Sequence, residues 1–156
     1  TGRSNRDYEF LIRTIEKTGT TGAACDMLNE ESHNNIEVRK NTWEGDAAIH
    51  EKGEAVVIAL DDDTIAAGQL VLLHDYDMGV PVIINCSHGV TDDYVIEHYN
   101  GLIIDKTEES LLTALDQIFN DKVLYSCLCE NGKKEFEDNY TYYAMGKNIG
   151  NILNSI

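Results

Sequence analysis

The sequence lacks the features that mark membrane, secreted and multidomain proteins. No apolar stretch approaches the roughly 20 residues that a helix needs to cross a bilayer, and the polar first residues contain no signal-peptide core. Proline occurs once in 156 residues, and no linker rich in proline or serine divides the chain. We therefore expect one soluble, cytoplasmic domain over residues 1–156 that has no transmembrane segment.

Basic residues are scarce as well. Lysine and arginine number 12 against 28 acidic residues, which gives a formal net charge of −16. Nucleic acids and anionic lipid surfaces are bound mainly through basic surface, so the composition argues against a nucleic acid as partner. An anionic ligand would need a local concentration of positive charge, and Arg3 and Arg6 form the close arginine pair in a loop-like segment.

Metal-binding motifs are also missing. The four cysteines do not have the paired spacing of a structural zinc site, and Cys127 and Cys129 are too close in sequence for a redox motif. We expect no metal and no other cofactor. Free cysteine behaves largely as a small apolar residue, so reduced and mostly buried side chains are expected at Cys25, Cys86, Cys127 and Cys129.

The apolar pattern alternates between strand and helix periods along the chain. Helical spacing predicts a first helix from Tyr8 that ends before Gly19, and Thr107 is placed to cap a later one. Apolar runs predict strands at residues 55–60, 81–86 and 101–104, and alternating apolar residues predict a short strand at 35–40. The strand signal at 20–27 is weaker. Further helices are predicted at 46–51, 68–78, 122–138 and 141–155, with a loop at 87–93 and a helical turn at 94–97.

Apolar strands that alternate with helices predict an α/β fold with a doubly wound parallel sheet and C-terminal helices. In such sheets the ligand lies beyond the carboxyl ends of the strands. Functional loops are therefore expected at residues 2–6, 41–45, 61–68 and 87–93. The chain opens without methionine on a segment that resembles the end of a strand, so we expect a piece of a longer polypeptide.

The first of these loops places Gly2, Arg3 and Arg6 just before the first predicted helix. Backbone N–H groups and the helix dipole favour anions there, and a guanidinium offers a planar pair of donors to phosphate oxygens. The alternative is that both arginines are solvated surface residues that pair with Asp7 or Glu9. The residues by themselves leave both interpretations open.

The third loop leads into a helix through Gly68 and Gln69. A glycine lets the backbone approach a ligand closely at a helix N-terminus, so these two residues are candidate phosphate contacts. His74 follows further into the same helix. Its imidazole is either a partner for a ligand hydroxyl or a partly buried helix residue.

Several segments follow one another in an order and spacing that match a known family. They are Gly2-Arg3-Ser4-Asn5-Arg6-Asp7-Tyr8, Ala67-Gly68-Gln69-Leu70-Val71-Leu72-Leu73, Met78-Gly79-Val80-Pro81-Val82-Ile83-Ile84, Ser87-His88-Gly89-Val90-Thr91-Asp92 and Tyr99-Asn100-Gly101-Leu102-Ile103-Ile104. Together they resemble the C-terminal, donor-binding domain of GT-B glycosyltransferases of family 4 (glycosyl transferases group 1). The resemblance spans nearly the whole chain and is strongest over residues 55–104.

The resemblance implies one Rossmann-like half of a GT-B fold, with the acceptor-binding N-terminal half absent from this chain. The implied activity is retaining, metal-independent transfer of a sugar from a nucleoside diphosphate sugar to an acceptor in polysaccharide or glycan biosynthesis. The full enzyme is expected to associate peripherally with a membrane, and this chain is not expected to be active alone.

The resemblance also implies which residues contact the donor, while no catalytic residue is assigned. By position, the donor diphosphate falls to Gly2, Arg3, Arg6, Gly68 and Gln69. The nucleotide ribose or base falls to His74 and to the loop that contains Asn41, Thr42 and Trp43.

Two positions differ from the family pattern. Many members have two glutamates separated by seven residues, and Ala66 and His74 occupy those positions here. A histidine can hydrogen-bond to a ribose hydroxyl but lacks the two acceptor oxygens of a carboxylate. Two other functions therefore stay open, namely a catalytically degenerate nucleotide-sugar-binding or scaffold domain and a fragment of a GT-B sugar-nucleotide epimerase. The sequence identifies neither the sugar, the base nor the acceptor.

Overall fold

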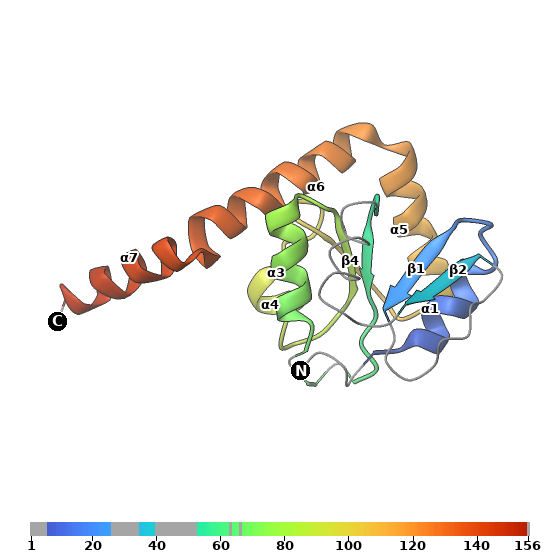
Figure 1. Ribbon diagram of the computed structural model, residues 1–156, viewed down its shortest axis with the longest axis horizontal. Helices are drawn as coiled ribbons and strands as arrows, with labels where there is room; N and C mark the ends of the chain where they lie inside the picture. The colour runs from blue at the N-terminus through green and yellow to red at the C-terminus, as the bar shows by residue number, and fades with distance from the viewer. Residues whose placement is uncertain (1–5, 26–34, 40–52, 63, 66, 156) are drawn as a thin grey trace.

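The computed structural model describes residues 6–25, 35–39, 53–62, 64–65 and 67–155 (Figure 1). In chain order the elements are α1 (Tyr8–Ile15), β1 (Gly22–Cys25), β2 (Ile36–Arg39), β3 (Val56–Ile58), α3 (Gln69–Met78), β4 (Val82–Asn85), α4 (Thr91–Tyr94), β5 (Leu102–Ile104), α5 (Glu108–Asn120), α6 (Lys122–Glu135), the π-helical segment η1 (Phe136–Tyr140) and α7 (Tyr142–Leu153). Among the described elements, α1 is followed by three strands, strands and helices then alternate up to β5, and helices alone follow β5.

The strands of the described residues pair in parallel, and helices cover both faces of the sheet that contains β4. β1 pairs with β2, and β4 lies between β3 and β5 in a second sheet. In the fully buried strand β4, Ile83 packs in a cluster with residues of α1, α5 and α6. Val82 and Ile84 pack in a second cluster with residues of α3, which lies beside β4 in Figure 1. This is the predicted Rossmann-like α/β arrangement.

Capping residues and glycines set the helix ends at the predicted places. The Asp7 side chain accepts a hydrogen bond from the first turn of α1, and the Thr107 side chain does the same for α5. Gly68 and Gly79 bracket α3 with φ angles of +93° and +67°. Residues with a Cβ rarely adopt positive φ, which explains a glycine at each end of this helix.

Some local segments differ from the prediction. The loop expected at residues 87–93 contains the start of α4, because the Thr91 hydroxyl donates to Ser87 O at 2.7 Å and closes a turn. The helical turn expected at 94–97 is wrong, since Val95 is extended. The weak strand signal at 20–27 does correspond to a strand, since β1 pairs along β2. The helix expected at 46–51 lies outside the described residues.

Cysteine burial also differs from the prediction. Cys86 is exposed, and Cys127 and Cys129 are half-buried free thiols. Cys86 directly follows the last residue of β4, where the buried part of the strand ends. The other two flank Leu128, which is the residue of this short segment that faces the core of the domain. Mostly buried cysteines are therefore a wrong expectation for these three residues.

Asn85, the last residue of β4, links β4 to the segment after β3, just beyond the last backbone pairing of these two strands. Its Oδ1 accepts from Leu60 N at 2.6 Å, and its Nδ2 donates to Leu60 O at 3.3 Å. The residue is 4% exposed, so these hydrogen bonds are shielded from water. The amide thus continues the strand pairing through a side chain and fixes the start of the loop that follows β3.

Asn85→Ala is expected to lower the free energy of unfolding by about 2 kcal/mol, because the buried N–H of Leu60 would lose its acceptor. Urea denaturation measures the change. Asn120→Ala is the matched control, since the exposed Asn120 amide donates to Asp116 on the surface of α5. That control should change stability by less than about 0.5 kcal/mol. Equal stability of the two variants would contradict a structural role for Asn85.

Candidate anion-binding site

Arg6 and Gly68 meet at the carboxyl end of β3. The backbone N of Asp7 donates to Ala59 O at 3.0 Å, which fixes the residue before α1 beside the end of that strand. Gly68 ends the loop that follows the same strand and begins α3. Two loops that are far apart in the sequence therefore converge at the edge where a doubly wound fold binds its ligands.

The space beside Gly68 is narrow and is bordered by the Arg6 guanidinium. A Cβ added to Gly68 would lie 3.5 Å from Nη2 and 3.6 Å from Nη1 of Arg6. It would also lie 3.2 Å from Cγ2 of Ile58, which is tighter than ordinary van der Waals contact. Only glycine combines the positive φ of this position with an approach of this kind. The missing side chain lets the guanidinium lie directly against the start of α3.

The electrostatics of this point favour an anion. The first N–H groups of a helix have no partner within the helix, and the helix dipole is positive at this end. Gly68, the N-cap of α3, has no side-chain oxygen to occupy those donors, whereas Asp7 supplies one to α1. Burial lowers the pKa of the Arg6 guanidinium against the opposing effect of Tyr8, yet arginine stays protonated in proteins. We call the combination of Arg6, Gly68 and the first turn of α3 the α3 anion site.

Lys106, which the sequence analysis did not select, neutralises two carboxylates at the same edge. Its Nζ lies 2.8 Å from Oδ2 of Asp7 and 3.3 Å from Oδ1 of Asp61. The hydrogen bond to Asp7 raises the pKa of Lys106. Burial acts to raise the pKa of Asp7, but the hydrogen bonds from Lys106 and Phe10 lower it overall. The signal for Lys106 was its position just after β5, at the carboxyl edge of the sheet.

Solved structures of other proteins share this architecture. A glycosyltransferase from Rickettsia africae matches over 97% of this chain with a TM-score of 0.79 and 14% sequence identity. HepE of Anabaena, solved in complex with UDP-glucose, matches over 97% of this chain with a TM-score of 0.77 and 13% identity. The chain has the fold of the C-terminal half of a GT-B glycosyltransferase. No protein-family model and no curated protein sequence matches it.

The GT-B match covers only part of the larger proteins. This chain spans 45% of the Rickettsia structure and 46% of the HepE structure. It spans 77% of a C-terminal domain of a glycosyl transferase group 1 protein, LpcC of Francisella tularensis, at a TM-score of 0.64 and 14% identity over 86% of this chain. This chain therefore matches less than half of the Rickettsia glycosyltransferase and less than half of HepE.

The structure shows where three of the residues predicted to contact a donor diphosphate lie. It brings together Arg6, Gly68 and Gln69, the last being the first residue of α3. His74 is half-buried on the same helix, about 7.5 Å along the axis from Gln69. The remaining predicted positions lie outside the described residues, namely Gly2, Arg3, Asn41, Thr42, Trp43 and Ala66.

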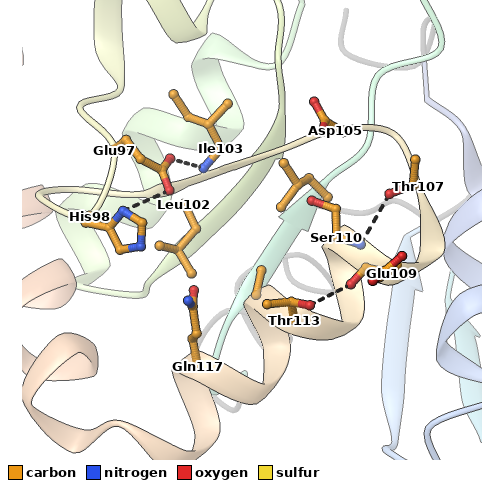
Figure 2. Close-up of a pocket in the computed structure, with 12 residues that line it drawn as sticks. Glu97, His98, Leu102, Ile103, Asp105, Thr107, Glu109, Ser110, Thr113 and Gln117 are labelled. Atoms are coloured by element: carbon orange, nitrogen blue, oxygen red, sulfur yellow. Dashed lines mark hydrogen bonds and ion pairs between the residues drawn. The ribbon is translucent and has the colours of Figure 1, made fainter.

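A pocket in the described residues lies away from Arg6 and Gly68, along β5 and α5 (Figure 2). It is a shallow groove of about 400 Å³. Its lining includes the carboxylates of Glu97, Asp105 and Glu109, which would repel a diphosphate. The Glu97 carboxylate accepts a hydrogen bond from Ile103 N, as Figure 2 shows, and so occupies a donor of the edge strand β5. The electrostatics thus favour the α3 anion site over this groove.

The residues that the structure describes contain no group of three or more His, Cys, Asp or Glu side chains arranged to hold a metal ion. A search of the same residues finds no helix long and apolar enough to cross a membrane.

Proposed function

We propose that this chain is the donor half of a glycosyltransferase and binds the diphosphate of a nucleotide sugar at the α3 anion site. The observation that supports the proposal most directly is the Arg6 guanidinium beside Gly68 at the N-terminus of α3. A guanidinium and free helix N–H groups together match the oxygens of a diphosphate. HepE, which shares the fold, was solved with UDP-glucose, which supports the class of ligand.

In the proposed reaction, the bond between the sugar C1 and the diphosphate oxygen breaks, and its electron pair leaves with the nucleoside diphosphate. The acceptor hydroxyl forms the new bond to C1 and gives its proton to the departing diphosphate. Arg6 and the first N–H groups of α3 stabilise the charge that grows on the departing diphosphate. Arg3 is proposed as a second cation for the same group, Gly2 as a backbone contact, and a metal is not needed for this stabilisation.

The remaining donor contacts belong to the same proposal. His74 is proposed to hydrogen-bond to a ribose hydroxyl, and the loop of Asn41 and Thr42 to contact the base. Transfer is proposed to retain the anomeric configuration, with an acceptor bound by the other half of the enzyme. We place the reaction in the cytoplasm, in polysaccharide or glycan biosynthesis, with the full enzyme peripherally associated with a membrane.

A second candidate function is nucleotide-sugar binding without turnover. The observation that favours it is His74 at a position where many glycosyltransferases of this type have a glutamate. The full-length polypeptide separates the candidates. A transferase converts the nucleotide sugar to nucleoside diphosphate only when an acceptor is present. An epimerase converts the nucleotide sugar to its epimer without an acceptor, and a scaffold domain binds the donor and leaves it intact.

Arg6→Ala is expected to weaken the affinity for UDP or GDP by about 10- to 100-fold, since a hydrogen bond to a charged group contributes about 1.5–3 kcal/mol. Isothermal titration calorimetry of the purified chain with UDP, GDP and their sugars measures the effect. Nucleotide binding should also raise the melting temperature of the chain. We expect the double variant Arg3→Ala and Arg6→Ala to lose this increase.

Arg13→Ala is the matched control for charge. The Arg13 side chain is 57% exposed and pairs with Glu108 at 2.8 Å, away from Gly68. The substitution removes one positive charge from the same helix that Arg6 precedes, so general electrostatics would affect both variants alike. Equal nucleotide affinities of the two variants, or no binding by the unaltered chain at millimolar nucleotide, would refute the proposed site.

A further inference from the structure

Lys106 contacts both segments that form the α3 anion site. It lies two residues after β5, at the carboxyl edge of the sheet. Its Nζ lies 2.8 Å from Oδ2 of Asp7, which directly follows Arg6 in the chain. The same Nζ donates to the backbone O of Asp61 at 3.2 Å and to Oδ1 of Asp61 at 3.3 Å. Asp61 belongs to the loop that leads from β3 to Gly68, so Lys106 links the two sides of the site.

These contacts occupy the ammonium group of Lys106. A lysine ammonium has three N–H donors and no acceptor. The three oxygens of Asp7 and Asp61 around Nζ account for all three donors. A phosphate oxygen could bind Lys106 only if one of these hydrogen bonds were broken. Lys106 is therefore suited to act on a ligand through its neighbours and not by direct contact.

Of the two carboxylates, that of Asp7 has the stronger effect on a bound anion. The Asp7 side chain is 21% exposed and that of Asp61 is 74% exposed, so water screens the charge of Asp61 far more. Asp7 and Arg6 are also consecutive residues, whose Cα atoms are about 3.8 Å apart. Without a cation beside it, the Asp7 carboxylate would repel a diphosphate bound at Arg6.

We infer that Lys106 is a positioning residue for the proposed diphosphate and acts through Asp7. It cancels the charge of the Asp7 carboxylate beside the α3 anion site and does not contact the ligand. The inference rests on the proposed function, because it concerns the affinity of that site for a nucleoside diphosphate. In a chain with a formal net charge of −16, an anion site depends on such local neutralisation as well as on its own donors.

Lys106→Met is expected to weaken the affinity for UDP by about three- to tenfold, because the charge of Asp7 then acts on the diphosphate across a partly screened distance. Isothermal titration calorimetry of the purified chain measures the effect. Lys17→Met is the matched control, since it removes the same kind of cation beyond the other end of α1. The Lys17 side chain is 56% exposed and pairs with Glu108. That control should change the affinity by less than about twofold.

Substitution of Asp7 separates neutralisation from a merely structural contact. Asparagine caps helices as well as aspartate does, so Asp7→Asn keeps the hydrogen bond from Phe10 N and removes the charge. The double variant Lys106→Met and Asp7→Asn should therefore bind UDP within about twofold of the unaltered chain. Asp7→Asn alone, which keeps the cation, should bind UDP more tightly than the unaltered chain. Thermal denaturation verifies that each variant is folded.

The salt dependence of binding is a second readout of the same charge. The ratio of the affinities of Lys106→Met and the unaltered chain should approach one at about 1 M salt, where the Debye length is about 3 Å. A contact that only held the backbone in place would leave that ratio unchanged by salt.

Two results would overturn the inference alone while UDP still binds and Arg6→Ala still weakens binding. One is an equal affinity of Lys106→Met and Lys17→Met. The other is a folded double variant that binds UDP as weakly as Lys106→Met does. No UDP binding by the unaltered chain would count against the proposed function and remove this inference with it.

Discussion

Tyr76→Ala is expected to lower the free energy of unfolding by about 3–5 kcal/mol, the largest effect expected of any single substitution proposed for this chain. Tyr76 is 1% exposed and packs where α3 crosses α6. A Cβ added to Gly132 of α6 would lie 2.9 Å from the Tyr76 ring, so the ring rests directly on the helix backbone. Its hydroxyl also donates to Tyr94 O at 3.3 Å. Thermal or urea denaturation measures the loss.

Tyr76→Phe is the matched control for that substitution. It keeps the ring and its packing and removes one hydrogen bond, so the expected loss is about 1 kcal/mol. Burial also raises the pKa of Tyr76, which keeps the hydroxyl neutral in the folded chain. A loss for Tyr76→Ala no larger than that for Tyr76→Phe would show that the contact between α3 and α6 contributes little to stability.

Gly101→Ala is expected to cost about 3 kcal/mol, at the upper end for one added carbon in a packed interior. The new Cβ would lie 2.8 Å from Cγ1 of Val95 and 3.3 Å from the backbone O of Val82. The neighbouring loop has little freedom to move, because Asn100 Oδ1 accepts from Ile96 N at 2.7 Å and Asn100 Nδ2 donates to Tyr94 O. Chemical denaturation measures the change in stability.

Gly146→Ala is the control for the effect of replacing a glycine. A Cβ added there would meet nothing within 4 Å, and the residue is inside α7. Alanine at this position should leave stability unchanged or raise it by up to about 1 kcal/mol. If both glycine variants were equally stable, the short distances around Gly101 would have no energetic meaning.

Much of the fold follows from local pattern, and the exceptions have local causes. Gly68, Gly79 and Thr107 mark helix ends because positive φ and side-chain capping are properties of single residues. The early start of α4 depends on the Thr91 hydroxyl and Ser87, a polar contact that hydrophobic periodicity does not register. Strand β1 depends on pairing with β2, which its own small residues do not indicate.

The sequence likewise predicts some features of the candidate site and not others. The identity of Arg6 and Gly68 as residues suited to a phosphate is readable from the sequence, since both stand at predicted junctions between strand and helix. Their proximity is not, because 61 residues lie between residues 6 and 68. The position of Lys106 after a predicted strand is readable in the same way, but its ion pairs are not, because Asp7 and Asp61 come from two other loops.

The sequence by itself determined the α/β class, the positions of most helices and strands, and the residues able to bind an anion. Those properties depend on near neighbours in the chain, whose spacing sets periodicity, capping and charge. The tertiary structure decided that Arg6 borders the N-terminus of α3 and that Asn85 links β4 to Leu60. These are long-range outcomes, since they arise only when a parallel sheet brings the carboxyl ends of separate strands to one edge.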